Sequence, residues 1–82
     1  MSGTISDTAI NVLAPLVGRA MATMYVIDAT HHLGRTTDEL RPGDVPALCD
    51  VLRSRIRPFA ARPVVDQAMA DITARTNFAS GR

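Results

Sequence analysis

A long apolar segment from Ile5 to Leu33 constrains the fold of this 82-residue chain more than any other feature. Its main helical stripe holds Ile10, Leu13, Val17, Ala20, Met21, Met24 and Ile27, and further apolar residues outside that stripe are Val12, Leu16, Ala22, Val26 and Ala29. A surface helix has an apolar face of roughly 100°, whereas a helix that is apolar most of the way round is buried on several sides. The segment therefore predicts one helix whose excess apolar surface is covered by a partner, most simply a second copy of the chain.

The size of the chain also favours self-association. A domain of this length hides only about 60% of the surface that its unfolded form exposes, and such small domains are usually reinforced by disulfides, a metal or oligomerisation. Cys49 is the single cysteine, so no disulfide can form within the chain. We expect one all-α domain over residues 1–82, a three- to four-helix antiparallel bundle completed by oligomerisation. A homodimer is the first expectation, and a tetramer stays open.

Capping residues and prolines divide the chain into helices. Pro15 predicts a kink or a restart of the first helix, because an internal proline removes one backbone hydrogen bond. Gly34 is a typical residue just past a helix end, Asp44 and Pro63 lie at helix starts, and Pro58 disfavours helical geometry before it. The predicted elements are a very apolar first helix over about 6–33, a second over about 45–57, a third over about 63–75 and a tail over 76–82.

Apolar spacing also predicts which faces of the later helices are buried. The expected inner faces are Val45, Leu48, Cys49, Leu52 and Ile56 in the second helix, with Phe59 left open, and Val64, Val65, Ala68, Met69 and Ile72 in the third.

The charge of the chain is nearly balanced, with nine arginines, no lysine and eight acidic residues. This balance does not favour nucleic acid or an anionic membrane as the default partner. Arg19 and Asp28 interrupt the first apolar segment, and a charge at mid-membrane is costly. The first residues also lack the positive stretch of a secretory signal. We therefore expect a cytoplasmic protein that does not associate with membranes.

Two groups of residues could carry chemistry, and neither is complete. Asp28 and His32 lie one helical turn apart and could supply two metal ligands, but a zinc site needs three or four. His31 and His32 have an alternative role in stabilising the C-terminal end of a helix dipole. Cys49 falls on an inner helix face, whereas a nucleophilic cysteine needs a depressed pKa and a nearby base. We therefore expect no enzymatic activity and no cofactor, and Asp28 and His32 are only weak metal candidates.

Four arginines, at positions 53, 55, 57 and 62, form the densest positive stretch. Arg53 and Arg57 share a helix face, whereas Arg55 points elsewhere. Arg53, Arg57 and Arg62 are candidates for contact with an anion or an acidic partner, because guanidinium groups pair well with carboxylate and phosphate. A solvated helix face would give the same pattern. The alternative function is a small helical nucleic-acid-associated protein that uses all four arginines.

A further pattern of residues extends over most of the chain. It reads Leu13-x-Pro15-Leu16-Val17-Gly18, Met21-Ala22, Val26, Ala29, Leu33-Gly34, Leu40-x-Pro42-x-Asp44-x-Pro46-x-Leu48 and Ile56-x-Pro58-Phe59. The pattern resembles small helical modules at the ends of bacterial signalling proteins such as protein kinases and nucleotide cyclases. The resemblance implies a regulatory or assembly role without catalysis, and it identifies no binding residues.

Together these features predict a non-enzymatic, self-associating helical adaptor or regulatory protein. It would act through contacts of the first helix with a second copy or another protein partner. The expected interface residues are Val12, Leu16, Met21, Met24 and Tyr25.

Overall fold

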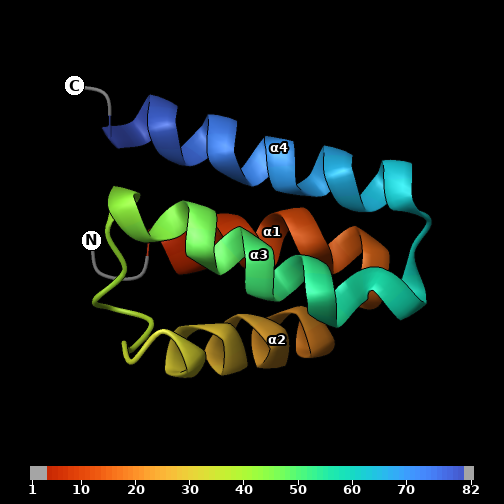
Figure 1. Ribbon diagram of the computed structural model, residues 1–82, viewed down its shortest axis with the longest axis horizontal. Helices are drawn as coiled ribbons and strands as arrows, with labels where there is room; N and C mark the ends of the chain where they lie inside the picture. The colour runs from red at the N-terminus through yellow and green to blue at the C-terminus, as the bar shows by residue number, and fades with distance from the viewer. Residues whose placement is uncertain (1–3, 81–82) are drawn as a thin grey trace.

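Four α-helices pack as an up-and-down bundle in the computed structural model, which describes the backbone of residues 4–80 and the side chains of residues 5–76 (Figure 1). The elements are α1 (Thr4–Val17), α2 (Arg19–His32), the short 3₁₀ helix η1 (Pro42–Asp44), α3 (Val45–Ile56), the 3₁₀ helix η2 (Arg57–Phe59) and α4 (Arg62–Ser80). Successive helices run in opposite directions, and α4 packs back against α1 to close the bundle. The predicted all-α fold is confirmed, with no strand between residues 4 and 80.

The single first helix predicted over about 6–33 does not form. The segment folds into two antiparallel helices, α1 and α2, which meet at Gly18 with φ 89° and ψ 152°. L side chains rarely adopt this backbone conformation, so glycine allows the chain to reverse here. The restart that was one alternative at Pro15 does not occur there, because α1 continues through Pro15 and ends at Val17. A kink at Pro15 stays a prediction. The amide of Gly18 donates to the carbonyl of Ala14 at 2.8 Å, which completes the end of α1.

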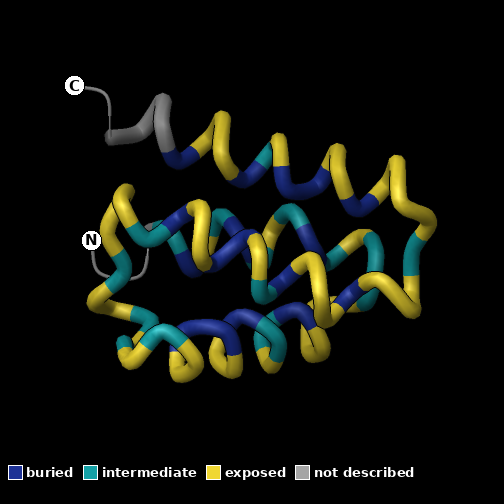
Figure 2. The backbone as a smooth tube through the Cα atoms, in the orientation of Figure 1, coloured by how far each residue is buried: buried dark blue, intermediate teal, exposed yellow. Residues whose placement is uncertain are grey.

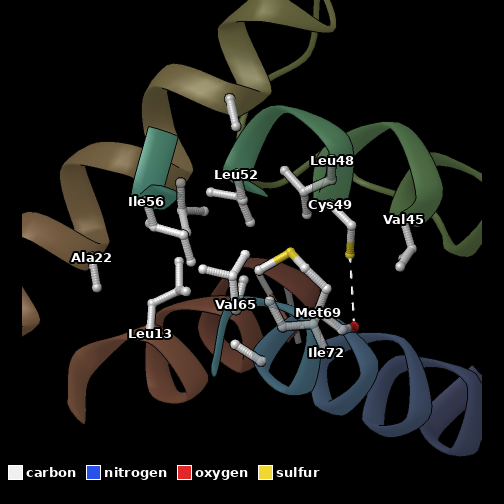
Figure 3. Close-up of a cluster of buried hydrophobic side chains, with 14 residues drawn as sticks. Leu13, Ala22, Val45, Leu48, Cys49, Leu52, Ile56, Val65, Met69 and Ile72 are labelled. Carbon is white, nitrogen blue, oxygen red and sulfur yellow. Dashed lines mark hydrogen bonds between the residues drawn. The ribbon is translucent and has the colours of Figure 1, made fainter. Parts of the chain in front are cut away.

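The core lies on the axis between the four helices, with the buried side of each helix turned inward (Figure 2). Figure 3 shows these side chains converging from all four helices. The buried hydrophobic residues are Ala9 and Leu13 of α1, Ala22, Val26 and Ala29 of α2, Val45, Leu48, Cys49, Leu52 and Ile56 of α3, and Val65, Ala68, Met69 and Ile72 of α4. The inner faces predicted for the later helices are therefore largely correct. Val64 is an exception, because it lies in the first turn of α4 and is 41% exposed.

Two hydrogen bonds fix the connection between α2 and α3 to the rest of the bundle. Gly34, with φ 74°, ends α2 as predicted, and the amide of Arg35 donates to the carbonyl of Thr30 at 2.9 Å. Farther along, the hydroxyl of Ser6 donates to the carbonyl of Thr37 at 2.7 Å, which ties this connection to α1. The connection is therefore fixed against the same end of the bundle as the start of α1.

The last helix is longer than predicted. α4 extends from Arg62 to Ser80 and so includes residues that were expected to form a tail from 76 onward. Thr76 explains part of this extension, because it is buried on the inner face and its hydroxyl donates to the carbonyl of Ile72 at 2.8 Å. Residues 81 and 82 of the expected tail lie outside the described residues. α3, by contrast, ends at Ile56, one residue before its predicted end, and η2 follows.

No helix in the described part of the chain has both the length and the apolar character that crossing a membrane requires.

Candidate functional site

The five expected interface residues lie on two different surfaces of the bundle. Val12 and Leu16 are half-buried on α1, whereas Met21 and Met24 are exposed on α2 and Tyr25 is half-buried beside them. Because α1 and α2 are separate antiparallel helices, these residues do not form the single interface on one continuous helix that was expected from the sequence. The reversal at Gly18 is what separates the two groups.

The outer face of α2 carries an exposed apolar stripe. Its apolar residues Ala20, Met24 and Ile27 follow one another at intervals of four and three residues, on the side opposite the buried Ala22, Val26 and Ala29, and the polar His31 follows four residues later. Met24 is 61% exposed and Ile27 is 40% exposed. Alternating intervals of three and four residues place side chains along one seam, which is the pattern of helices that pack against other helices. The small side chain of Ala20 would let a second helix approach closely.

Phe59 extends this apolar surface beyond α2. Its ring lies in η2 and packs against Tyr25, with ring centroids 6.1 Å apart. Phe59 nevertheless stays 60% exposed. Sequence reasoning missed its surface position because Phe59 follows the end of a helix, where helical spacing no longer predicts direction. Met21, Met24, Tyr25, Ile27 and Phe59 are called the α2 surface below.

Arginines that are separated in sequence converge on a groove between α3 and α4. The groove has a volume of about 400 Å³ and is lined by Asp50, Arg53, Ser54, Arg57, Ala60, Arg62, Val65 and Asp66. Arg53 comes from α3, Arg57 from η2 and Arg62 from the first position of α4. These are the three residues that the sequence marks as candidates for anion contact. The groove is called the arginine groove below.

Arg55 does not join this group. Its guanidinium forms an ion pair of 2.8 Å with the carboxylate of Asp28, which links α3 to α2. The four arginines between 53 and 62 therefore do not form one basic surface. This ion pair also engages Asp28, one of the two weak metal candidates.

The charges within the arginine groove are only loosely paired. The carboxylate of Asp66 lies 3.8 Å from a guanidinium nitrogen of Arg53 and 4.0 Å from one of Arg62. Among the described residues, no ion pair shorter than 4.0 Å involves Arg57 or Asp50. Three arginines and two aspartates give the groove a net positive charge.

A second groove, of about 440 Å³, lies between α1 and α4. It is lined by Asn11, Val12, Pro15, Leu16, Pro63, Val64, Gln67, Ala68, Asp71 and Arg75. This is the position of Val12 and Leu16, the two interface candidates on α1. Its walls are largely apolar, and its polar edge includes a hydrogen bond of 3.0 Å from the amide of Gln67 to the carboxylate of Asp71.

The residues considered for metal binding and catalysis are not assembled into a site. Within residues 5–76, no three metal-ligating side chains come together, and His31 and His32 are exposed at the end of α2. Cys49 is buried, and its thiol lies 3.9 Å from the carbonyl of Met69 and 3.8 Å from the hydroxyl of Thr73. Burial raises the pKa of this thiol, although the hydrogen bond with Thr73 acts in the opposite direction. A raised pKa keeps the thiol protonated and weakly nucleophilic.

Comparisons of the chain with protein-family models, with curated proteins and with solved structures gave no match. The resemblance to modules of bacterial signalling proteins stays a prediction. The surfaces described above are the basis on which a function can be assigned.

Proposed function

We propose that this protein is a non-enzymatic, self-associating helical adaptor or regulatory protein in which the α2 surface of one copy packs against that of a second. One observation carries the proposal. Among the side chains of residues 5–76, four of the five exposed large hydrophobic residues, namely Met21, Met24, Ile27 and Phe59, belong to the α2 surface. Isolated exposed apolar residues are ordinary on soluble proteins, whereas their concentration on one surface is typical of an interaction site.

A second copy is the simplest occupant because the stripe is self-complementary. Met24 lies near the middle of α2, and Met21 and Ile27 lie three residues to either side of it. In an antiparallel pair of α2 helices related by a two-fold axis at Met24, each Met21 would therefore approach the other copy's Ile27. Such isologous contacts are the commonest arrangement in homodimers. Apolar side chains would therefore meet at the centre of the seam, around Met24.

The expected dimer is weak. α2 has 14 residues, and a helix of this length is about 21 Å long. One face of such a helix offers less than the roughly 800 Å² per partner of a standard interface. Burying a methionine side chain contributes roughly 1.5–3 kcal/mol, so a few such residues support association at micromolar rather than nanomolar concentration. The oligomeric state should therefore depend on protein concentration.

Light scattering on a size-exclusion column, over a series of protein concentrations, tests the proposal. The mass of the wild-type protein should rise from monomer to dimer as concentration increases. Met24→Asp should stay monomeric at every concentration and keep its helical circular dichroism, because the side chain points away from the core. Ala70→Asp is the matched control, since it adds the same charge at an exposed position of α4 and should still dimerise.

The variant Leu16→Asp tests whether the dimer interface is the α2 surface or the groove between α1 and α4. Leu16 lines that groove and does not belong to the α2 surface. A folded Leu16→Asp protein should therefore dimerise as the wild type does. If it is monomeric while Met24→Asp dimerises, or if the wild type is monomeric throughout, the proposed interface is overturned.

The nucleic-acid alternative gains no support from the arrangement of the arginines. It uses Arg53, Arg55, Arg57 and Arg62 together, and Arg55 is paired with Asp28 away from the others. The remaining three line one groove between α3 and α4, which does not form a continuous basic surface with Arg55. Self-association through the α2 surface therefore remains the proposal.

A further inference from the structure

We propose that the arginine groove binds a small molecule bearing phosphate groups through Arg53, Arg57 and Arg62. The groove shares no residue with the α2 surface, although Arg57 and Phe59 both lie in η2, so the site is proposed apart from the self-association. Guanidinium groups present planar arrays of donors that match phosphate oxygens, which makes arginine well suited to this ligand.

The guanidinium groups of the groove keep most of their hydrogen-bonding capacity. Charge-assisted hydrogen bonds between nitrogen and carboxylate are about 2.7–2.9 Å long. The contacts of Asp66 with Arg53 and Arg62, at 3.8 and 4.0 Å, are well beyond that range. By comparison, a guanidinium nitrogen of Arg55 lies 2.8 Å from the carboxylate of Asp28, which is within that range. The three arginines of the groove therefore have donors left for a ligand.

The chain reversal after α3 brings these donors to one place. Arg53 lies in the last turn of α3, η2 carries Arg57, and Arg62 begins α4. Because α3 and α4 are neighbours in the bundle (Figure 1), all three arginines line the same groove although they come from three elements. A ligand in the groove could contact guanidinium groups from α3, η2 and α4, which a single basic helix face does not provide.

The two aspartates of the groove determine which anions can compete for it. Asp66 is about half exposed and its contacts are long, so it can turn toward solvent at little cost. A ligand with a single carboxylate would gain little binding free energy by taking the place of the Asp66 carboxylate beside the arginines. A multiply charged phosphate compound would gain more, because its charge interacts with all three guanidinium groups. The volume of about 400 Å³ lies within the range of small-molecule sites.

Calorimetric titration with inorganic pyrophosphate at low ionic strength tests the site. The wild-type protein should bind pyrophosphate, and Arg57→Gln should weaken binding by about tenfold, as expected for loss of hydrogen bonds to a charged group. Arg41→Gln is the control, because it removes the same charge from an exposed position outside the groove and should change affinity less than twofold. Asp50→Asn should tighten binding, because it removes a repelling charge from the groove.

Several outcomes would overturn the site. If Arg57→Gln and Arg41→Gln weaken pyrophosphate binding equally, pyrophosphate is attracted to the overall charge of the protein and not to a specific site. Equal affinity for succinate and pyrophosphate would remove the preference for phosphate. Loss of binding to a short DNA duplex in Arg55→Gln, with no binding of pyrophosphate by the wild type, would favour the nucleic-acid alternative. Because Arg57 is not part of the α2 surface, its variant should keep the wild-type dependence of mass on concentration, so the two proposals fail separately.

Discussion

The ring of Phe59 packs against the ring of Tyr25, with centroids 6.1 Å apart and planes inclined by 38°. Tyr25 lies on α2 and Phe59 in η2, so the contact joins the turn after α3 to the edge of the proposed interface. Tilted aromatic pairs contribute about 0.5–1.5 kcal/mol beyond the burial of their surface. The pair thus stabilises the bundle while it leaves most of Phe59 open to a partner.

Replacing Phe59 should affect both stability and association. Phe59→Ala is expected to lower the free energy of unfolding by about 1 kcal/mol, because it removes the aromatic pair but little buried surface. It should also shift dimer formation to higher concentration in light scattering. Val64→Ala is the control, since Val64 is exposed on α4 and does not belong to the α2 surface. Identical association of Phe59→Ala and wild type would remove Phe59 from the interface.

The reversal between α1 and α2 should depend on the backbone of Gly18. Gly18→Ala should lower the free energy of unfolding by about 1–2 kcal/mol, because an L residue is strained at φ 89°. Gly43→Ala should change it little, since Gly43 has no positive φ. At both sites an added Cβ meets no atom within 4 Å, so the comparison isolates backbone strain from crowding. Urea unfolding of the two variants measures the difference, and equal stabilities would contradict the turn described here.

The ion pair between Arg55 and Asp28 should make a small, salt-dependent contribution to stability. Both side chains are about half exposed, and such pairs contribute about 0.2–1 kcal/mol. A double-mutant cycle with Arg55→Gln and Asp28→Asn should give a coupling in this range that shrinks at high salt. The same cycle for Arg62 and Asp66, which are 4.0 Å apart and whose arginine is 92% exposed, should give no measurable coupling. Coupling of equal size in both pairs would mean that distance does not decide their strength.

Cys49 should make the protein less stable at alkaline pH. Burial raises the pKa of the thiol above its ordinary value of 9.0, so the folded protein holds this proton more tightly than the unfolded chain does. This stabilising contribution is complete below the pKa of the unfolded thiol and is lost as the pH rises toward the pKa of the folded one. The free energy of unfolding should therefore fall more steeply above pH 9.0 in the wild type than in Cys49→Ala. Parallel pH profiles would show that the thiol does not titrate differently on folding.

Local pattern predicted α3 and the core side of α4 well. Leu48, Leu52 and Ile56 recur at intervals of four residues, and all three are fully buried. Such spacing determines which side of a helix is apolar, whatever that side packs against. The error at Val64 occurs at an element end, because periodicity says little about a first helical turn. The same reason left the burial of Phe59 open, since Phe59 follows a helix end.

The candidate surfaces were only partly predictable. The sequence identified Met21, Met24 and Tyr25 as interface candidates, and these remain together on α2. It also placed Val12 and Leu16 with them, which required the first helix to be continuous. Local signals favoured a break at Pro15 over one at Gly18, because proline in a helix interior is the costlier residue. The actual reversal at Gly18 lets α1 and α2 bury their apolar faces against each other and against the remaining helices.

Local sequence pattern is enough to predict that this chain forms helices, that α2 ends before Gly34 and that certain faces of α3 and α4 are buried. These properties depend on hydrogen bonds and side-chain spacing within a few residues along the chain. The packing of the helices against one another, in contrast, sets the reversal at Gly18, the groove shared by Arg53, Arg57 and Arg62, and the pairing of Arg55 with Asp28. These outcomes depend on which helix faces pack together. That packing is determined by many contacts between residues distant in sequence, so a local pattern cannot predict it.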